Sequence, residues 1–129
     1  MPTYALVMRL EAPEEMSIGA LGRHVFRAGY YVYVGSAARG LWPRLARHLR
    51  RQKPLHWHAD YLTTVATPVE AWIDLSAEDR ECLWARLLLQ SPGASLPVRG
   101  FGASDCHCAG HLAFFRVKPS FEALLTHEG

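Results

Sequence analysis

Residues 30–37 read Tyr-Tyr-Val-Tyr-Val-Gly-Ser-Ala, and residues 41–51 read Leu-Trp-Pro-Arg-Leu-Ala-Arg-His-Leu-Arg-Arg. The first run is rich in aromatic and β-branched residues, which predicts a strand over residues 30–34 that ends at Gly35. The second run repeats leucine every fourth residue, and its proline lies near the first turn, where the missing N–H is not needed. We therefore expect a strand that is followed closely by a helix.

The basic residues of the chain are concentrated around this helix. Residues 16–59 contain no Asp or Glu, yet they hold eight of the fourteen Lys and Arg residues. A basic face of this kind is typical of nucleic-acid binding, because Lys and Arg that neutralise phosphates release condensed counterions. A solvated basic helix face is the alternative that charge alone leaves open. The candidate phosphate contacts are Arg39, Arg47, Arg50, Arg51 and Lys53.

The pattern along the rest of the chain predicts one small α/β domain. Strands are expected over residues 4–10, 69–75 and 111–117, and a hairpin over residues 17–26 leads into the 30–34 strand. Helices are expected over residues 41–51, 56–65, 76–90 and 121–125, the third with Ser76 as its N-cap. The 129 residues, half of them hydrophobic, can bury one sizeable core. We expect a single α+β domain over residues 1–129, with a small, mostly antiparallel central sheet flanked by helices.

The sequence gives no sign of secretion or of membrane insertion. Its N-terminus lacks a charged segment followed by an apolar run, and no stretch approaches the roughly 18 to 20 apolar residues of a membrane span. Cys82, Cys106 and Cys108 cannot all pair within one chain, and a bridge between the last two would be strained. We expect a soluble cytoplasmic protein, not bound to membrane, with free thiols.

Two segments resemble motifs of the GIY-YIG nuclease superfamily. The run from Tyr33 to Ala37, with the arginine-bearing helix after it, looks like the second half of that family's signature. The segment Glu81-Cys82-Leu83-Trp84 is similar to its metal-binding glutamate helix. Order and spacing agree over residues 3–88, and the segment over residues 100–112 is similar to that of a small stand-alone subfamily.

The chain departs from the GIY-YIG pattern in two places. The first Gly-Ile-Tyr appears as Pro2-Thr3-Tyr4, so only the tyrosine matches. The usual asparagine after the glutamate helix has no counterpart, because the chain contains no asparagine. Ser104 or Asp105 is the expected substitute.

The resemblance implies a metal-dependent endonuclease that hydrolyses phosphodiester bonds of DNA with a single metal ion; RNA is not excluded as the substrate. Glu81 would hold Mg²⁺ or Mn²⁺, with waters and substrate oxygens completing the coordination. Arg44 would grip the phosphate with its rigid guanidinium fork. No base-reading element is evident, so DNA shape or a protein partner would supply the specificity.

The resemblance also implies which residues transfer protons. Tyr4 is the expected general base, although a free phenol has a pKa of about 10 and needs nearby cations to lower it. Tyr33 would position the water or share that role. His48 lies one turn after Arg44 on the same helix face, and His56 follows in the next segment. Either imidazole would relay a proton.

Two functions from other classes remain open. A non-catalytic nucleic-acid-binding module is expected if the altered first motif and the absent asparagine abolish turnover. A zinc-stabilised interaction domain is expected if Cys106, Cys108 and a histidine such as His111 bind metal, or if the histidines and Asp60 of residues 56–60 do. One residue separates the two cysteines rather than the usual two of a thiolate knuckle. We therefore expect the loop over residues 104–111 to pack beside the catalytic groove without metal.

Overall fold

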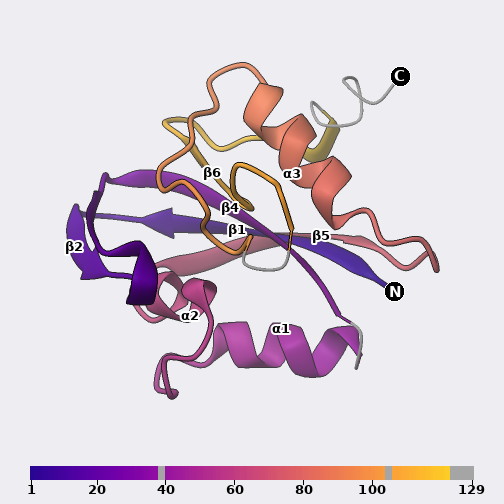
Figure 1. Ribbon diagram of the computed structural model, residues 1–129, viewed down its shortest axis with the longest axis horizontal. Helices are drawn as coiled ribbons and strands as arrows, with labels where there is room; N and C mark the ends of the chain where they lie inside the picture. The colour runs from indigo at the N-terminus through magenta and orange to yellow at the C-terminus, as the bar shows by residue number, and fades with distance from the viewer. Residues whose placement is uncertain (38–39, 104–105, 123–129) are drawn as a thin grey trace.

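An antiparallel sheet forms the centre of the computed structural model, which describes residues 1–37, 40–103 and 106–122 (Figure 1). Within these residues the central sheet has four strands in the order β5-β1-β4-β6. Their bounds are Thr3–Leu10 for β1, Gly29–Ser36 for β4, Thr67–Asp74 for β5 and Leu112–Phe115 for β6. Each neighbouring pair is antiparallel. The predicted α+β class with a small antiparallel sheet is confirmed.

Helices pack on both faces of this sheet. In Figure 1, α1 (Leu41–Leu49) and α2 (His58–Thr63) lie below the sheet and α3 (Glu81–Gln90) lies above it. A separate hairpin is formed by β2 (Glu14–Ser17) and β3 (Arg23–Phe26), joined through the 3-10 turn Gly19–Leu21. Among the described residues, none of the helices has the length and apolar character that crossing a membrane requires.

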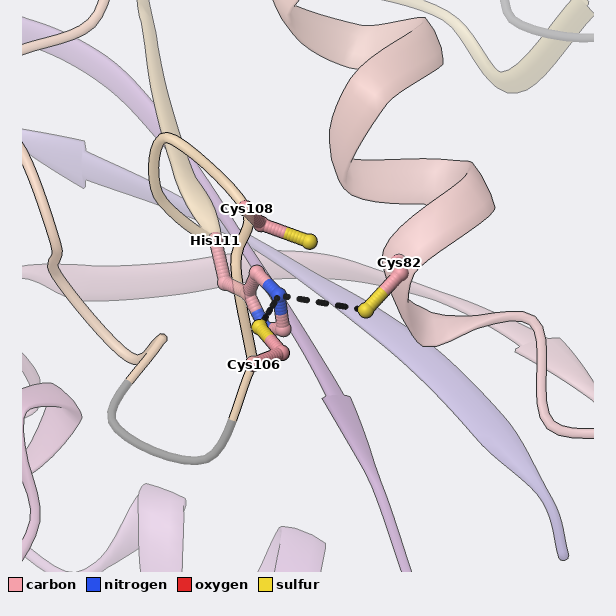
Figure 2. Close-up of side chains that lie close together, drawn as sticks. All are labelled: Cys82, Cys106, Cys108 and His111. Carbon is pink, nitrogen blue, oxygen red and sulfur yellow. Dashed lines mark hydrogen bonds between the residues drawn. The ribbon is translucent and has the colours of Figure 1, made fainter.

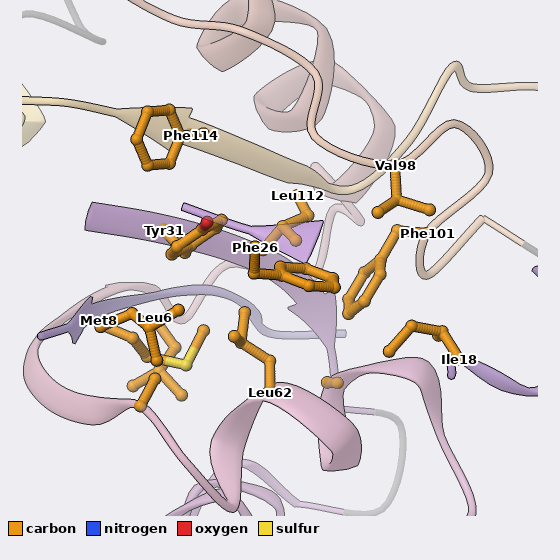
Figure 3. Close-up of a cluster of buried hydrophobic side chains, with 13 residues drawn as sticks. Leu6, Met8, Ile18, Phe26, Tyr31, Leu62, Val98, Phe101, Leu112 and Phe114 are labelled. Carbon is orange, nitrogen blue, oxygen red and sulfur yellow. The ribbon is translucent and has the colours of Figure 1, made fainter. Parts of the chain in front are cut away.

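The central strand β1 is buried on both faces. Successive side chains of a strand point to opposite sides of the sheet. Leu6 accordingly packs in a cluster with Leu62 of α2 (Figure 3), while Val7 packs in a second cluster with Trp84 of α3. This double burial explains why β1 reads as a nearly continuous apolar run rather than as an alternating one.

The pairing of β1 with β4 explains the glycine of the motif. Tyr4 lies directly opposite Gly35. A Cβ atom at position 35 would lie 2.5 Å from the Tyr4 hydroxyl oxygen, so this position tolerates no side chain. The strand continues through Gly35 to Ser36 instead of ending at the glycine as predicted.

The start of α3 differs from the prediction. The helix begins at Glu81 rather than after Ser76, because backbone N–H groups before it form hydrogen bonds with a nearby and a distant side chain. Asp74 accepts the backbone N–H of Ser76 at 2.8 Å. The backbone N–H of Arg80 donates to the hydroxyl of Thr3 at 2.9 Å, across the sheet edge.

The other differences are smaller. The hairpin begins at Glu14 rather than at residue 17 as predicted, and the second helix is shorter than the predicted 56–65. Most of the helix expected over residues 121–125 lies outside the described residues, as do Arg39, Ser104 and Asp105. The predicted roles of those three side chains stay predictions.

Candidate functional site

A pocket of about 210 Å³ opens between β4, α1, the segment before α2 and the first turn of α3. We call it the polar pocket. Its lining residues are Tyr33, Arg44, His56, Trp57, His58, Glu81 and Gly102. The structure thus brings together four of the six residues predicted for catalysis, from segments as far apart as positions 33 and 81.

Glu81 is held at the base of α3 with its carboxylate partly exposed. The Asp79 carboxylate accepts the backbone N–H of Glu81 at 3.0 Å, which fixes the first turn. Ser36 Oγ lies 3.5 Å from Glu81 Oε2, and Nδ1 of His111 lies 3.5 Å from Oε1. Both contacts of the carboxylate are long, so its oxygens remain able to bind a metal ion.

Arg44 is anchored beside this carboxylate. Its Nη2 donates to the carbonyl of Ser36 at 2.9 Å, and its guanidinium lies 4.1 Å from the ring centroid of Trp57. A guanidinium carries five N–H donors, so Arg44 can hold Ser36 and an anion at the same time. The stacking on Trp57 keeps the guanidinium plane oriented.

Tyr33 forms one wall of the pocket. Its ring packs edge-on against His48 and Phe101, with centroid separations of 5.6 and 6.2 Å. Burial, followed by the nearby Glu81 carboxylate, raises the pKa of Tyr33 to about 12, and Arg44 opposes this rise. Gly102 closes the wall: it has a φ of +70°, and a Cβ there would lie 2.8 Å from the Tyr33 ring.

Tyr4 and His48 lie behind that wall, fully buried. The Tyr4 hydroxyl oxygen and His48 Nε2 are 2.6 Å apart. Burial, and next the neighbouring Tyr33, raise the pKa of Tyr4 above its ordinary value. Burial, and then the charges of Lys53 and Arg44, lower the pKa of His48 to about 4. The pair is therefore neutral at pH 7, and neither member belongs to the described lining of the polar pocket.

Asp60 organises the segment that carries the pocket histidines. Its fully buried carboxylate accepts the backbone N–H groups of His56 and Trp57 at 2.9 and 2.8 Å, and it pairs with Arg47 at 2.8 Å. Although burial opposes it, these hydrogen bonds lower the pKa of Asp60. Asp60 is thus a structural carboxylate, and the predicted metal group over residues 56–60 is not found among the described residues.

Sequence reasoning missed Trp57 as a pocket residue. Its ring is stacked by two arginines, with guanidinium distances of 4.1 Å for Arg44 and 4.6 Å for Arg47. The only local signal is that Asp60, three residues later, accepts the backbone N–H of Trp57 at 2.8 Å, as an acidic residue in the first turn of a helix can do.

The predicted phosphate contacts do not all face solvent freely. Arg47 is engaged by Asp60, and Lys53 Nζ donates to the last carbonyls of α1, those of Arg47 and His48, at 2.8 and 3.2 Å. Arg51 bonds Thr64 and Thr67 while remaining exposed. Arg50 is exposed at the end of α1. Among the described candidates, Arg50 and Arg51 are therefore exposed, whereas Arg47 and Lys53 are partly buried and engaged within the protein, and the phosphate contacts stay a prediction.

A second group of side chains lies close to Glu81 and includes its chain neighbour Cys82. Cys82, Cys106, Cys108 and His111 form what we call the thiol–imidazole cluster, and their ligand atoms all lie within 4.8 Å of one another (Figure 2). Despite burial, hydrogen bonds from Cys82 and His111 lower the pKa of the Cys108 thiol. The four side chains can hold a metal ion, and their sulfur and nitrogen donors suit a zinc-like ion rather than Mg²⁺.

Sequence reasoning missed Cys82 as a member of this cluster. The residue precedes Cys106 by 24 positions, so no local spacing connects the two, and Cys82 is read simply as the neighbour of Glu81. The expectation of a metal-free loop followed from the one-residue spacing between the two loop cysteines. With Cys82 as a third thiol, that objection from spacing no longer applies.

His111 lies between the two groups. Its Nε2 is 3.3 Å from Cys106 Sγ and 3.9 Å from Cys82 Sγ, and its Nδ1 faces Glu81. The imidazole is almost completely buried. Although burial opposes it, the Glu81 carboxylate and Cys108 raise the pKa of His111.

No curated protein and no solved structure matches this chain. A family model described as "Domain of unknown function DUF123" matches residues 3–128. Because this match spans nearly the whole sequence, including the polar pocket and the thiol–imidazole cluster, the chain belongs to the DUF123 family.

Proposed function

We propose that this protein is a metal-dependent endonuclease that hydrolyses phosphodiester bonds of DNA in the polar pocket. The observation that carries the proposal is the convergence of Tyr33, Arg44 and Glu81, from three separate elements, on one pocket. Backbone hydrolysis uses these residue types: a hydroxyl to position water, a cation to bind phosphate and a carboxylate to bind metal. The same residues carry the resemblance to GIY-YIG nucleases.

The polar pocket fits a hard cation such as Mg²⁺ or Mn²⁺ on Glu81. Such cations prefer oxygen ligands and usually retain several waters. One carboxylate at the edge of a pocket of about 210 Å³ leaves room for those waters and for phosphate oxygens. When bound, the cation would stabilise the negative charge that develops on the phosphate oxygens.

The protein's own side chains bind the phosphate, orient the attacking water and accept its proton. Arg44 binds a phosphate oxygen while it remains bonded to Ser36. The Tyr33 hydroxyl orients the attacking water, and His56, exposed at the pocket rim, accepts its proton. As the water oxygen bonds to phosphorus, the P–O bond to the leaving sugar oxygen breaks, and that oxygen takes a proton from solvent water. We assign the proton to His56 because the pKa of Tyr33, at about 12, keeps that phenol protonated at neutral pH.

Tyr4 and His48 act as positioning residues in this mechanism. Their buried hydrogen bond of 2.6 Å lies against the Tyr33 ring, whose centroid is 6.3 Å from that of Tyr4. Both groups are neutral, so the pair supplies a rigid support without adding charge next to the phosphate. His56, which lines the pocket, therefore serves as the general base in place of Tyr4, for which the resemblance implies that role.

The test is a single-turnover cleavage assay with Mg²⁺ or Mn²⁺ on duplex, branched, damaged and single-stranded DNA, with RNA in parallel. The proposal expects metal-dependent cleavage of at least one DNA substrate that Glu81→Gln loses and the exposed variant Glu11→Gln keeps. Binding without cleavage by the wild type, on every substrate and with both metals, would overturn it.

A non-catalytic nucleic-acid-binding module is the second candidate. It is favoured by the burial of the Tyr4–His48 pair, which removes from the pocket a hydroxyl that the resemblance places in catalysis. The same assay distinguishes the two functions, because a binding module retains salt-dependent affinity without turnover.

A further inference from the structure

We propose that Cys82, Cys106, Cys108 and His111 bind one Zn²⁺ ion, and that this ion orients the Glu81 carboxylate through His111. The second part rests on the proposed function only in giving Glu81 a catalytic use. The metal site itself is independent of that use.

The donor set and its spacing match a closed zinc site. Tetrahedral zinc with Zn–S bonds of about 2.3 Å places its sulfurs about 3.8 Å apart. Here the ligand atoms lie within 4.8 Å of one another, and His111 Nε2 lies 3.3 Å from Cys106 Sγ and 3.9 Å from Cys82 Sγ. A contraction of about 1 Å at the longest separation completes the tetrahedron. Four protein ligands leave no open position, which is typical of a structural zinc.

The backbone around the cluster is already folded into place. The loop closes on itself through hydrogen bonds from Gly100 N–H to the Ala109 carbonyl and from His111 N–H to the Phe101 carbonyl, both 2.7 Å. The carbonyl of His111 accepts the N–H of Val34 in β4 at 2.9 Å. The imidazole is therefore tied to the central sheet, while Cys82 projects from the first turn of α3 toward it (Figure 2).

The cluster fits no simpler explanation. Cys82 is exposed, so it does not serve as a small buried hydrophobe. A single disulfide would use two of the three thiols and leave the third beside the imidazole. A metal ion uses all four donors and joins α3 to the loop that precedes β6.

His111 connects this ion to the polar pocket. A metal on Nε2 leaves the hydrogen on Nδ1, which in zinc sites is donated to a carboxylate, a carbonyl or a water. Nδ1 is buried, has no hydrogen-bond partner among the described residues, and lies 3.5 Å from Glu81 Oε1. A shift of about 0.5 Å makes that contact a hydrogen bond. Glu81 is then held by His111 on one side and by its chain neighbour Cys82 on the other.

The first experiment measures metal on the intact protein. Elemental analysis and native mass spectrometry should find one zinc per wild-type chain, and Co²⁺ replacing it should give the intense visible bands of a tetrahedral thiolate site. Cys82→Ser and Cys106→Ser should lose the metal, whereas His107→Ser, in the same loop but outside the cluster, should keep it. A wild type without zinc, or weak octahedral Co²⁺ bands, would overturn the proposal even if the cysteine variants fail to fold.

The second experiment measures the link to Glu81 through zinc affinity, in competition with a chromophoric chelator. Glu81→Ala should weaken zinc binding by about 10- to 100-fold, as expected for loss of a carboxylate partner of a metal-bound histidine. Glu78→Ala, exposed just before α3, should leave the affinity unchanged. Equal affinity in Glu81→Ala and wild type would overturn the link. Zinc content and DNA cleavage are separate readouts, so failure of the nuclease proposal leaves this result interpretable.

Discussion

The polar pocket and the thiol–imidazole cluster meet at the first turn of α3 but differ in chemistry. Glu81 and Cys82 are neighbours in the chain, and their side chains leave the helix about 100° apart. Glu81 faces a pocket lined by oxygen and nitrogen groups, whereas Cys82 faces two more thiols and an imidazole. One helix turn can therefore contribute a ligand to a hard cation that keeps open coordination positions and another to a softer cation whose four positions are all filled by protein side chains.

The two groups depend on the fold in different ways. The polar pocket takes Tyr33, Arg44 and Glu81 from a strand and two helices, and its side chains have further structural contacts, such as that of Arg44 with Trp57. The cluster joins α3 to a loop through its side chains alone, so its metal would contribute to folding. Substitutions in the pocket should reduce activity, whereas substitutions in the cluster should destabilise the packing of the loop against α3.

The largest effect is expected for Glu81→Gln, which keeps the shape of the side chain but removes its charge. Metal assistance is worth several kcal/mol of transition-state stabilisation, so single-turnover cleavage should fall by about 10³-fold. DNA affinity should remain, since Arg44 and the basic residues are unchanged. Glu11→Gln, exposed between β1 and β2, is the matched control. Cleavage retained in Glu81→Gln would contradict the assigned metal ligand.

A smaller effect separates the two tyrosines. Tyr33→Phe removes a hydroxyl from the pocket wall and should lower the cleavage rate by about 10²-fold, at the lower end of the range for positioned proton-transfer groups. Tyr4→Phe removes the buried hydroxyl on His48 and should instead lower the free energy of unfolding by about 1 kcal/mol. Single-turnover rates and denaturant unfolding of both variants are the measurements. A larger loss of rate in Tyr4→Phe would restore Tyr4 as the general base.

The fold was predictable from the sequence where local pattern and tertiary packing agree. The apolar run of β1 and the leucine repeat of α1 gave both elements to within two residues. The start of α3 was missed because Ser76 is a good N-cap in isolation, whereas Asp74 binds its N–H in the structure. The contact between Arg80 and Thr3 spans 77 residues, which no local pattern encodes.

The candidate site was predictable to a similar degree and for the same reason. A resemblance in order and spacing pointed to Tyr33, Arg44, His56 and Glu81, which share the pocket. It could not indicate burial, so the separation of Tyr4 and His48 from that pocket became evident only in three dimensions. The contribution of Cys82 to the cluster depends on the packing of α3 beside the loop.

The buried carboxylate of Asp60 supports the pocket. Asp60→Asn should lower the free energy of unfolding by about 2 kcal/mol, less than for a fully buried pair because Arg47 is partly exposed. The folded-state pKa of Asp60 is lowered, so its charge stabilises the fold above the unfolded pKa of about 3.9 and ceases to do so as pH falls through the folded value. Chemical denaturation at several pH values should show wild type and Asp60→Asn differing at pH 7 and converging below about pH 4. A constant difference would show that packing, not charge, carries the effect.

The smallest effect is expected at the basic end of α1 and tests which residues touch DNA. Arg50 and Arg51 are exposed, although Arg51 also bonds Thr64 and Thr67, while Arg47 and Lys53 are partly buried and engaged within the protein. Each phosphate neutralised on duplex DNA contributes about −0.9 to the slope of log affinity against log salt. Replacing Arg50 and Arg51 by alanine should therefore make the slope less negative by about 1.8, with the folded structure unchanged by circular dichroism. Arg86→Ala, exposed on α3, is the matched control and should leave the slope unchanged. An unaltered slope in the double variant, or an equal change in Arg86→Ala, would place the DNA on another face of the molecule.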